Sequence, residues 1–441
     1  MQAVASAILQ RLTDARKETD NLFEIVRSRV LYERPIPERH RIIFYVGHLE
    51  TFDWNLLRER LLCAESFDPQ FDRLFAFGID PVGGGLPTDQ PSDWPSLAQV
   101  REYNRRIRQT IDDGIEKMDL SNGSHGGFSA ELLLNVAIEH RLMHAETLCY
   151  MLHQLPPANK VPPQKSKTNL PALPITKQMI KIPEGSATLG LPRNGRFGWD
   201  NEFEANQVDV PAFAVDKYKV TNGQYLEFID AGGYENRSLW SDADWNWAKS
   251  EKISHPAFWK KSEGQWLYRT MFEEIPLPLD WPVYISHAEA SAYARSVGKS
   301  LPTEAQWHRA AYGTPEGNER EFPWGDVAAD ENSRLGNFDF ASWDPTPVTA
   351  FPEGQSAFGV TDLLGNGWEW TSTVFAPFAG FERFPFYPGY SADFFDGKHY
   401  VLKGGSARTA ACMLRRSFRN WFQAHYQYVY AGFRCISPAG E

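Results

Sequence analysis

The chain has 441 residues, of which 42% are hydrophobic and 23% are charged. This composition is ordinary for a globular protein, and the length is too great for one core, so two domains are expected. A formal net charge of −11 without a basic tract argues against a nucleic-acid partner, and no apolar run is long enough to cross a membrane. The N-terminus lacks the pattern of a signal peptide. The cysteines are scattered without a Cys-x-x-Cys pair, so we expect a cytoplasmic protein with neither disulfides nor a zinc knot.

The first 155 residues carry the periodicity of helices. Apolar residues at steps of three and four over residues 8–26 predict a first helix that ends before Pro35, and a second helix is expected over about residues 38–63. These two segments begin a domain that we expect to be built from helices alone.

Two further helices complete the predicted bundle. One is expected after Pro95, where Ser96 and Gln99 form a capping box, and another over about residues 129–153. The buried side of the former is predicted from its apolar stripe: Val100, Tyr103, Ile107, Ile111 and Ile115. Four helices of this length are typical of a bundle with polar sites on its inward faces.

The segments between and after the helices differ in composition. Residues 77–95 are rich in Gly, Pro and Asp and too long for a mere connection, which suggests a lid or a binding loop. Residues 156–177 contain six prolines and no periodicity, which predicts a stiff linker. Residues 178–441 are dense in aromatic residues and glycine and predict an irregular α+β domain. Helices are expected in it only near 223–231, 287–297 and after Pro302.

Three histidines of the first domain have the spacing of a metal site. His140 and His144 are four residues apart and therefore share one face of a helix, while His48 lies in another predicted helix. Neither motif offers a dedicated carboxylate ligand, so three imidazoles alone would leave coordination positions of the metal open. The spacing therefore predicts an open metal site between two helices.

The second domain carries an ordered series of phrases. They are VTNGQYLEFI (220–229), SLPTEAQWHRAA (300–311), FPWGD (322–326), GNGWEWTS (365–372), KGGSAR (403–408) and AGFRC (431–435). The series resembles the formylglycine-generating-enzyme fold, a variant of the C-type lectin fold. The first domain resembles the DinB-type four-helix bundle. The two together resemble the EgtB-type iron enzymes of ergothioneine biosynthesis over nearly the whole chain.

This resemblance implies roles for several residues. The family's iron ligands fall on His48, His140 and His144, and its H-x-x-x-H-x-E pattern is matched through Glu146. Hercynine, the betaine of histidine, carries a quaternary ammonium that suits aromatic faces. The resemblance places hercynine at four positions: Asn420, Trp421, Phe422 and Met143.

Three departures from the family pattern concern the second substrate. The segment that carries the family's catalytic tyrosine has Phe375 and Phe378, and neither ring can deliver a proton. Phe422 stands where the family has an aspartate, and Asn104 stands where it has an arginine, although Arg105 follows directly. The charged contacts expected for a γ-glutamylcysteine-like donor are therefore mostly missing.

A less charged donor fits this altered pattern. Asp80, Asp89 and Asp93 in the 77–95 loop offer carboxylates for sugar hydroxyls, and the wording of the loop resembles the selenoneine synthase branch of the family. That branch joins a selenosugar to hercynine. Together with Asn104 and Arg105, the loop residues Asp80 and Asp89 are the expected donor contacts. The expected reaction is Fe(II)- and O₂-dependent C–Se or C–S bond formation on the imidazole of hercynine.

Three other functions stay open at this stage. A sulfoxide synthase acting on cysteine or γ-glutamylcysteine would need another proton donor, for which Tyr426, Tyr428 and Tyr430 cannot be ranked. Formylglycine generation needs a cysteine pair, and the surroundings of Cys412 and Cys435 do not match that motif. A non-catalytic module could bind sugars with the second domain and hold a structural metal in the bundle.

Overall fold

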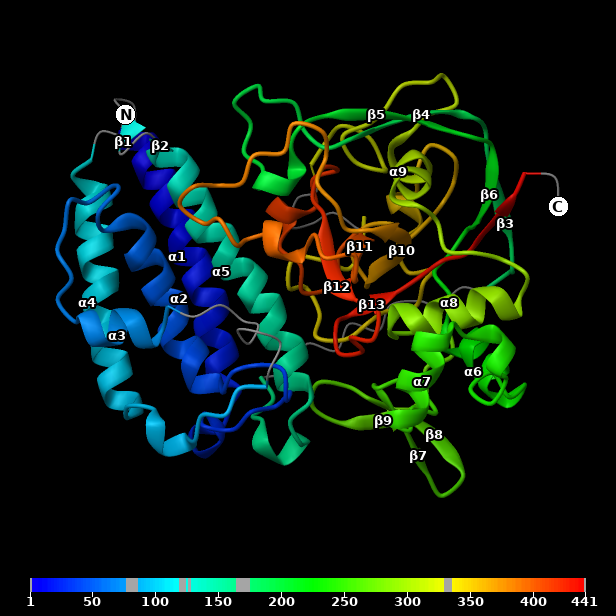
Figure 1. Cartoon of the computed structure of the whole chain (residues 1–441), viewed down its shortest axis with the longest axis horizontal. Coiled ribbons are helices and arrows are strands. Elements are labelled where there is room, and N and C mark those ends of the chain that lie inside the picture. Colours follow the sequence, from blue (N-terminus) through cyan, green and yellow to red (C-terminus); the bar gives the residue numbers. More distant parts are fainter. Residues whose placement is uncertain are drawn as a thin grey trace. The chain divides into compact units, whose positions relative to one another are not determined.

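The computed structural model describes residues 2–76, 86–118, 124–125, 128–163, 175–328 and 335–439. The chain divides into two compact units, Met1–Lys165 and Ser166–Glu441, which are described separately below. The first is helical and the second mixes short strands with helices (Figure 1). The α and α+β fold classes predicted for the two parts are thereby confirmed.

The first unit is built on four long helices. They are α1 (Gln2–Glu24), α2 (Ile42–Leu57), α4 (Leu97–Glu116) and α5 (Ala130–His153). Helix α1 packs on α5, and α2 packs on both α4 and α5. The predicted capping box of Ser96 and Gln99 is present at the start of α4, and the predicted apolar stripe is its buried side. Periodicity therefore located the four helices and the inward faces of α1 and α4.

Helix α2 is shorter than its prediction at both ends. It begins only after Arg41 and ends at Leu57, so that Cys63, whose φ of 49° is left-handed, lies outside it. The short helix α3 (Pro69–Leu74) was not foreseen. Asp68 caps it by accepting from the Phe71 N–H over 3.0 Å, and Pro69 occupies its first turn. A pair of two-residue strands, β1 (Ser124–His125) and β2 (Phe128–Ser129), precedes α5.

Part of the predicted linker packs on the first unit. Residues 157–159 form a short 3₁₀ turn, the Arg27 N–H donates to the Asn159 carbonyl over 3.1 Å, and the Val161 N–H donates to the Ile25 carbonyl over 2.7 Å. Lys160 is buried. Residues up to 161 are therefore held by main-chain hydrogen bonds, although their prolines suggest an extended connection.

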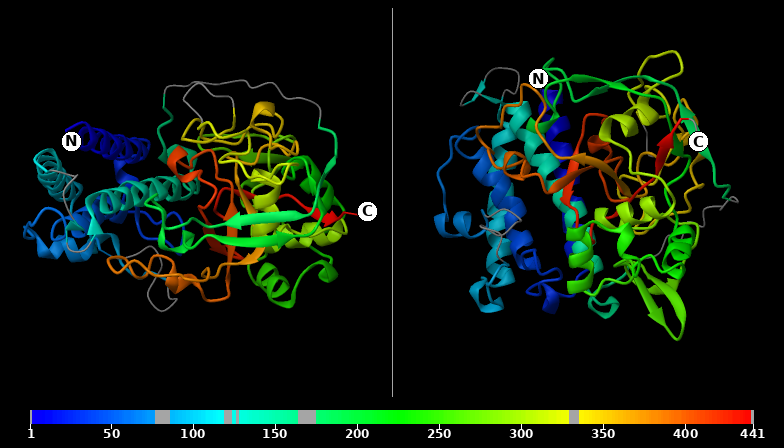
Figure 2. Two further views of the ribbon diagram at one scale, coloured as in Figure 1. Left: turned by 90° about the horizontal axis from the view of Figure 1, so that it is seen from above. Right: turned by 45° about the vertical axis from the view of Figure 1, so that its right-hand side comes forward.

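The second unit contains several small sheets. A four-stranded sheet has the order β12-β11-β10-β13, and a three-stranded sheet has the order β14-β6-β3. Strands β4 and β5 pair as an antiparallel two-stranded ribbon, whose arrows lie side by side in the left view of Figure 2, and β7, β8 and β9 form a three-stranded antiparallel sheet. The strands are β3 (Met179–Ile182), β4 (Gly185–Leu189), β5 (Asn206–Val210), β6 (Phe213–Asp216), β7 (Trp259–Ser262), β8 (Gln265–Arg269), β9 (Glu274–Pro276), β10 (Trp368–Val374), β11 (His399–Lys403), β12 (Asn420–Gln423), β13 (Ala431–Gly432) and β14 (Ile436–Pro438).

The second unit also contains short helices. The three predicted ones are α6 (Asn222–Asp230), α8 (His287–Ser296) and α9 (Glu304–Tyr312), while α7 (Asp242–Ser250) was not foreseen. Trp307 and Tyr312 of α9 lie in the main core with Val215 of β6 and Leu189 of β4. In the described part of the chain, no helix is both long enough and apolar enough to span a bilayer.

Candidate metal centre

Helices α2 and α5 bring the three predicted histidines together. His48 comes from α2, and His140 and His144 come from successive turns of α5. The candidate ligand atoms of the three side chains all lie within 4.8 Å of one another, and each residue is at most 3% exposed. The triad fits a metal site.

Distances and one hydrogen bond indicate which ring nitrogen of each histidine could bind a metal. The Nε2 atoms of His140 and His144 are 3.2 Å apart. Two imidazole nitrogens that bind one ion at about 2.1 Å each, with a right angle between the two bonds, are about 3 Å apart. The observed distance is close to that value. His48 Nδ1 lies 2.7 Å from the Phe75 carbonyl oxygen. Because a carbonyl can only accept, Nδ1 carries the proton, and Nε2 is the nitrogen left for a metal.

The histidines are in the neutral form that binds metals. Burial lowers the pKa of His48 to about 4, against the weaker opposing effect of its hydrogen bond to Phe75. Burial also lowers the pKa of His140 and His144 well below the usual value, helped by the neighbouring histidines. All three imidazoles are therefore neutral at neutral pH, with one nitrogen free of a proton, which is the state that a metal ion requires.

Aromatic rings fix the orientation of the imidazoles. The Phe52 ring stacks on His140 with centroids 3.4 Å apart and an angle of 11°. Phe44 stacks on His48 at 4.7 Å, and Tyr45 lies 5.8 Å from His144. These rings limit rotation of the ligands and shield them from water.

A buried ionic cluster lies beside the histidines. Arg141 follows His140 in sequence and donates to Asp53 over 2.7 Å and to Glu50 over 3.0 Å. Arg108 of α4 also binds Glu50, over 2.6 Å. Burial opposes the ionisation of Glu50, but the charges of Arg141 and Arg108 outweigh it and hold the pKa of Glu50 well below its usual value. Sequence reasoning missed Arg141, although a basic residue in an apolar helix was a usable signal.

The residues predicted to bind the donor are spread over the first unit. Asn104 of α4 donates to the Val46 carbonyl over 2.7 Å, two residues before His48, and its Oδ1 is buried with no hydrogen-bond partner in the described structure. Arg105, by contrast, is 62% exposed and paired with Glu102. Its exposure separates it from the buried histidines, because successive residues of a helix face different directions.

The 77–95 loop is described only from residue 86. Asp80 lies outside the described residues. Asp89 accepts from Arg41 and Trp94, each over 2.8 Å, and is also paired with Arg34. Partial burial opposes ionisation, but these contacts hold the pKa of Asp89 below its usual value. Asp93 closes a turn by accepting from the Gln90 N–H. A sugar hydroxyl would have to compete with the two arginines for Asp89.

In the second unit, the side chains of Asn420, Trp421 and Phe422 point alternately to the two faces of a sheet. These residues belong to β12, in which successive side chains point to opposite faces. Trp421 stacks on Phe375 with centroids 4.2 Å apart, whereas Phe422 stacks on Tyr426 at 5.0 Å. The structure therefore places the two rings on opposite faces of the sheet. Met143, also predicted to lie beside hercynine, is half-buried on α5 of the first unit.

The two positions that replace the family tyrosines contact one cation. The Arg419 guanidinium lies 5.0 Å from the Phe375 ring centre and 4.1 Å from that of Phe378, and it donates to Glu304 over 3.0 Å. Phe375 is only 1% exposed. This segment is therefore a packed stack of aromatic rings and a guanidinium group.

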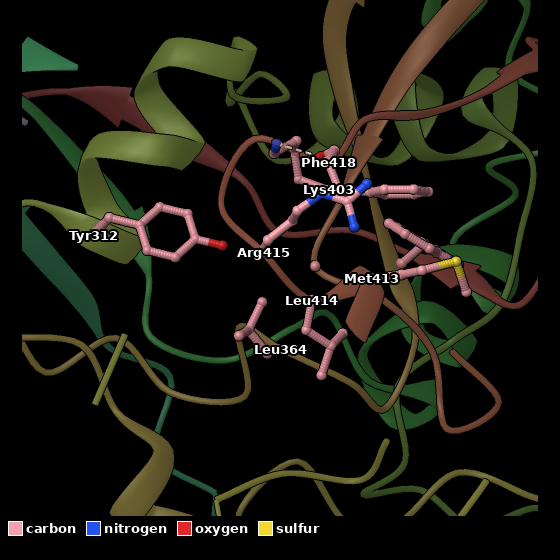
Figure 3. A pocket seen from close by; sticks show the side chains of 9 residues that line it. Tyr312, Leu364, Lys403, Met413, Leu414, Arg415 and Phe418 are labelled. Carbon is pink, nitrogen blue, oxygen red and sulfur yellow. Dashed lines mark hydrogen bonds between the residues drawn. The ribbon is translucent and has the colours of Figure 1, made fainter. Parts of the chain in front are cut away.

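A small cavity of the same unit is too confined for an organic substrate. Figure 3 shows it between Tyr312, Leu414 and Phe418, with Lys403 at its wall. Its volume of about 10 Å³ is close to the space of one water molecule. Lys403 donates to the Phe418 carbonyl over 2.6 Å, and burial lowers its pKa to about 8.

Comparison with known proteins covers both units. Residues 11–148 match the family model of the DinB superfamily, and residues 166–439 match that of the sulfatase-modifying factor enzyme 1-like domain. A protein of Mycolicibacterium thermoresistibile described as hercynine oxygenase is 36% identical over 97% of this chain and 94% of its own length. The hercynine oxygenase of Mycolicibacterium smegmatis is 34% identical over 83% of each chain.

Among solved structures, PvdO from Pseudomonas aeruginosa matches 59% of this chain and 94% of its own length, with 20% identity and a TM-score of 0.40.

Proposed function

This chain belongs to the hercynine oxygenase family, and from that premise we propose that it is a non-haem iron enzyme that uses O₂ to join a sulfur donor to the imidazole ring of hercynine. The observation that carries the proposal is the buried triad of His48, His140 and His144 in a chain similar to hercynine oxygenase over almost its full length. We also propose the division into a bundle (1–155), a linker (156–177) whose first residues are bonded to the bundle, and a second domain (178–441).

In this proposal each histidine holds iron through its Nε2 atom. Bound Fe(II) would activate O₂ and favour the anionic form of the sulfur donor. The side chains of this protein supply the remaining functions. The Phe75 carbonyl holds the Nδ1 proton of His48, and the rings of Phe44 and Phe52 keep the imidazoles in place and exclude water.

The proposed hercynine contacts are those of the resemblance: Asn420, Trp421, Phe422 and Met143. Trp421 has the kind of aromatic ring that suits a quaternary ammonium. Phe375 stacks on this ring, and Tyr390 and Phe394 also lie against it. The division of β12 between two faces favours Trp421 and Phe422 contributing to different parts of the binding surface.

A selenosugar donor is a second candidate, favoured by one set of residues. Asn104 and Phe422 replace charged residues that would hold a γ-glutamylcysteine donor, and Phe375 replaces a phenol. A buried carboxylate without a partner costs several kcal/mol, which corresponds to a discrimination of roughly 100-fold or more. The proposed donor contacts remain Asp80, Asp89, Asn104 and Arg105. The ion pairs of Asp89 and the exposure of Arg105 disfavour donor binding by those two residues.

The two functions outside this class have less support. Cys412 is exposed whereas Cys435 is buried, an arrangement that does not favour a shared thiol site for formylglycine generation. A non-catalytic sugar-binding module would leave three converging neutral imidazoles with a structural metal only, and such sites usually have four protein ligands.

One assay separates these functions. The purified chain is loaded with Fe(II) without O₂, mixed with hercynine and one of γ-glutamylcysteine, cysteine or a selenosugar, and then exposed to O₂. Oxygen uptake is recorded, and products are identified by mass spectrometry. A hercynine–sulfur adduct formed most efficiently from a thiol supports the main proposal, and a selenosugar preferred by 100-fold or more supports the second. Neither O₂ uptake nor an adduct with any donor would reject both.

A further inference from the structure

We propose that Gly47 is a positioning residue of the metal centre, because its missing side chain lets Phe75 seat its ring on α2 and thereby hold the His48 imidazole through the Phe75 carbonyl. The inference rests on the proposed function in assuming that the three histidines bind a metal. Its first readout, however, is made on the metal-free protein.

Gly47 and Phe75 are in closer contact than any larger residue would allow. A Cβ atom built on Gly47 would lie 2.5 Å from both Cδ1 and Cε1 of the Phe75 ring and 2.7 Å from its Cγ. Carbon atoms that are not bonded do not approach so closely, since the optimal separation is about 3.5–4.0 Å. Any side chain at position 47 must therefore displace the ring.

The Phe75 ring has little room to move. It is fully buried, and its centre lies 5.8 Å from that of Trp94, 6.3 Å from that of Tyr103 and 5.7 Å from that of Phe71. A displacement of the ring would therefore have to be taken up by the main chain of Phe75.

The segment before Phe75 is anchored independently of Gly47. Tyr103 donates to the Asp72 carboxylate over 2.6 Å, Ser66 donates to the other carboxylate oxygen over 2.6 Å, and Asn55 donates to the Asp72 carbonyl over 3.2 Å. Helix α3 is thus fixed on α2 and α4 from one side. The contact with Gly47 determines where the chain lies at its other end.

The same residue supplies the hydrogen bond that selects the nitrogen of His48. The Phe75 carbonyl accepts from Nδ1 over 2.7 Å, and His48 directly follows Gly47 in α2. Phe75 therefore spans two successive residues of the helix, with its ring on one and its carbonyl at the other. If the ring is pushed away, this carbonyl moves with it, and nothing then favours the Nδ1–H tautomer over the Nε2–H tautomer.

A matched pair of substitutions tests the proposal. Gly47→Ala introduces the clash, and Gly114→Ala is the control because it adds the same methyl group to α4 of the same bundle. There the new Cβ would lie 2.5 Å from Cδ2 of Leu62, which is the far end of a flexible side chain and can rotate away. Both variants remove a helical glycine, so a difference between them reports on Phe75.

Two measurements are made on each variant. The tautomer of His48 is assigned by ¹⁵N NMR of the metal-free protein, and Co(II) affinity is measured by competition with a chelator. We expect wild type and Gly114→Ala to show the Nδ1–H form. Gly47→Ala should lose it and bind Co(II) roughly 10- to 100-fold more weakly, the usual cost of losing a partner that orients a ligand. A Gly47→Ala protein with the Nδ1–H tautomer and wild-type affinity would overturn the proposal.

A second variant keeps the test decisive if Gly47→Ala does not fold. Phe75→Leu removes the flat ring that lies on Gly47 but keeps a buried apolar side chain and the carbonyl, so it should fold and lose part of the Nδ1–H form. A Phe75→Leu protein with the wild-type tautomer and Co(II) affinity would also reject the role of the contact between Gly47 and Phe75. Wild-type protein that shows the Nδ1–H tautomer but binds no Co(II) would count against the metal centre and not against the positioning of His48.

Discussion

Arg141 on α5 donates to Asp53 on α2 over 2.7 Å, and both side chains are at most 1% exposed. The bond joins the two helices that carry the histidines, one residue after His140 and five residues after His48. Glu50, one turn before Asp53, binds the same guanidinium. Burial raises the pKa of Asp53, whereas Glu50, which is also paired with Arg108, keeps a lowered pKa. The arginine therefore compensates two carboxylates that no water reaches.

Removing this arginine should strongly destabilise the first unit. Arg141→Met leaves Glu50 and Asp53 buried with less compensation, which typically costs about 3–5 kcal/mol of unfolding free energy. Urea unfolding followed by circular dichroism measures the effect. The control is Arg105→Met, which breaks an exposed pair with Glu102 and should leave the unfolding free energy close to that of the wild type, because solvent screens such a pair. Equal losses in the two variants would contradict a special role for the buried pair.

Removing one histidine should abolish metal binding without unfolding the bundle. His140→Ala leaves two imidazoles, too few for a facial set of ligands, and α5 keeps its other buried contacts. Iron content after reconstitution and O₂-dependent turnover should both fall to background, with helix content unchanged. His255→Ala, at a half-buried histidine of the second unit, should keep both at wild-type levels. Bound iron in the His140→Ala variant would reject the triad.

A phenol restored at position 375 should shift the donor preference toward thiols. Phe375→Tyr adds a hydroxyl that can deliver a proton, as the tyrosine of related sulfoxide synthases is expected to do. We expect the ratio of kcat/KM for γ-glutamylcysteine to that for a selenosugar to rise. Because the ring is buried between Trp421 and Arg419, the hydroxyl should also cost about 1–3 kcal/mol of stability if it lacks a partner. An unchanged ratio in a folded variant would contradict this expectation.

The metal-free protein should lose stability as the pH falls below neutrality. Burial lowers the pKa of His48 from 6.5 to about 4, so the unfolded chain takes up a proton first. The stabilisation is complete above pH 6.5, and it declines as the pH falls toward 4. For this residue the change is roughly 3 kcal/mol. Urea titrations at pH 7, 6 and 5 after chelation should show the decline, and His48→Gln should reduce its slope. A slope that the substitution leaves unchanged would assign the loss to other groups.

The sequence predicted the long helices well and the short elements poorly. Helices α1 and α4 repeat their apolar pattern over several turns, so their inward faces could be identified residue by residue, whereas α5 is buried on nearly all sides. Helix α3 has six residues, too few for a period, and only the Asp68-Pro69 pair marked its start. Strands such as β12, with four residues, are also too short for a clear alternation, so no strand bounds were predicted.

The part of the candidate metal centre that consists of side chains could be predicted from the sequence. Three histidines at helical spacing predicted the triad, but the Phe75 carbonyl is a main-chain group, present in every residue, and leaves no mark in the sequence. The partners of Asp89 were also hidden, because Arg41 and Arg34 lie 48 and 55 residues away in the chain. Such distant ion pairs require the folded structure.

The hydrogen bonds of Asn159 and Val161 to the first unit determine at which residue a protein made of that unit alone should end. A polypeptide stopped at residue 155 would lose both bonds and leave the Arg27 amide and the Ile25 carbonyl to solvent. It would also lose Lys160, which is buried and donates to the His153 carbonyl at the end of α5. A separately expressed bundle should therefore extend at least to residue 163, even though the prolines that begin at 156 suggest an earlier stop.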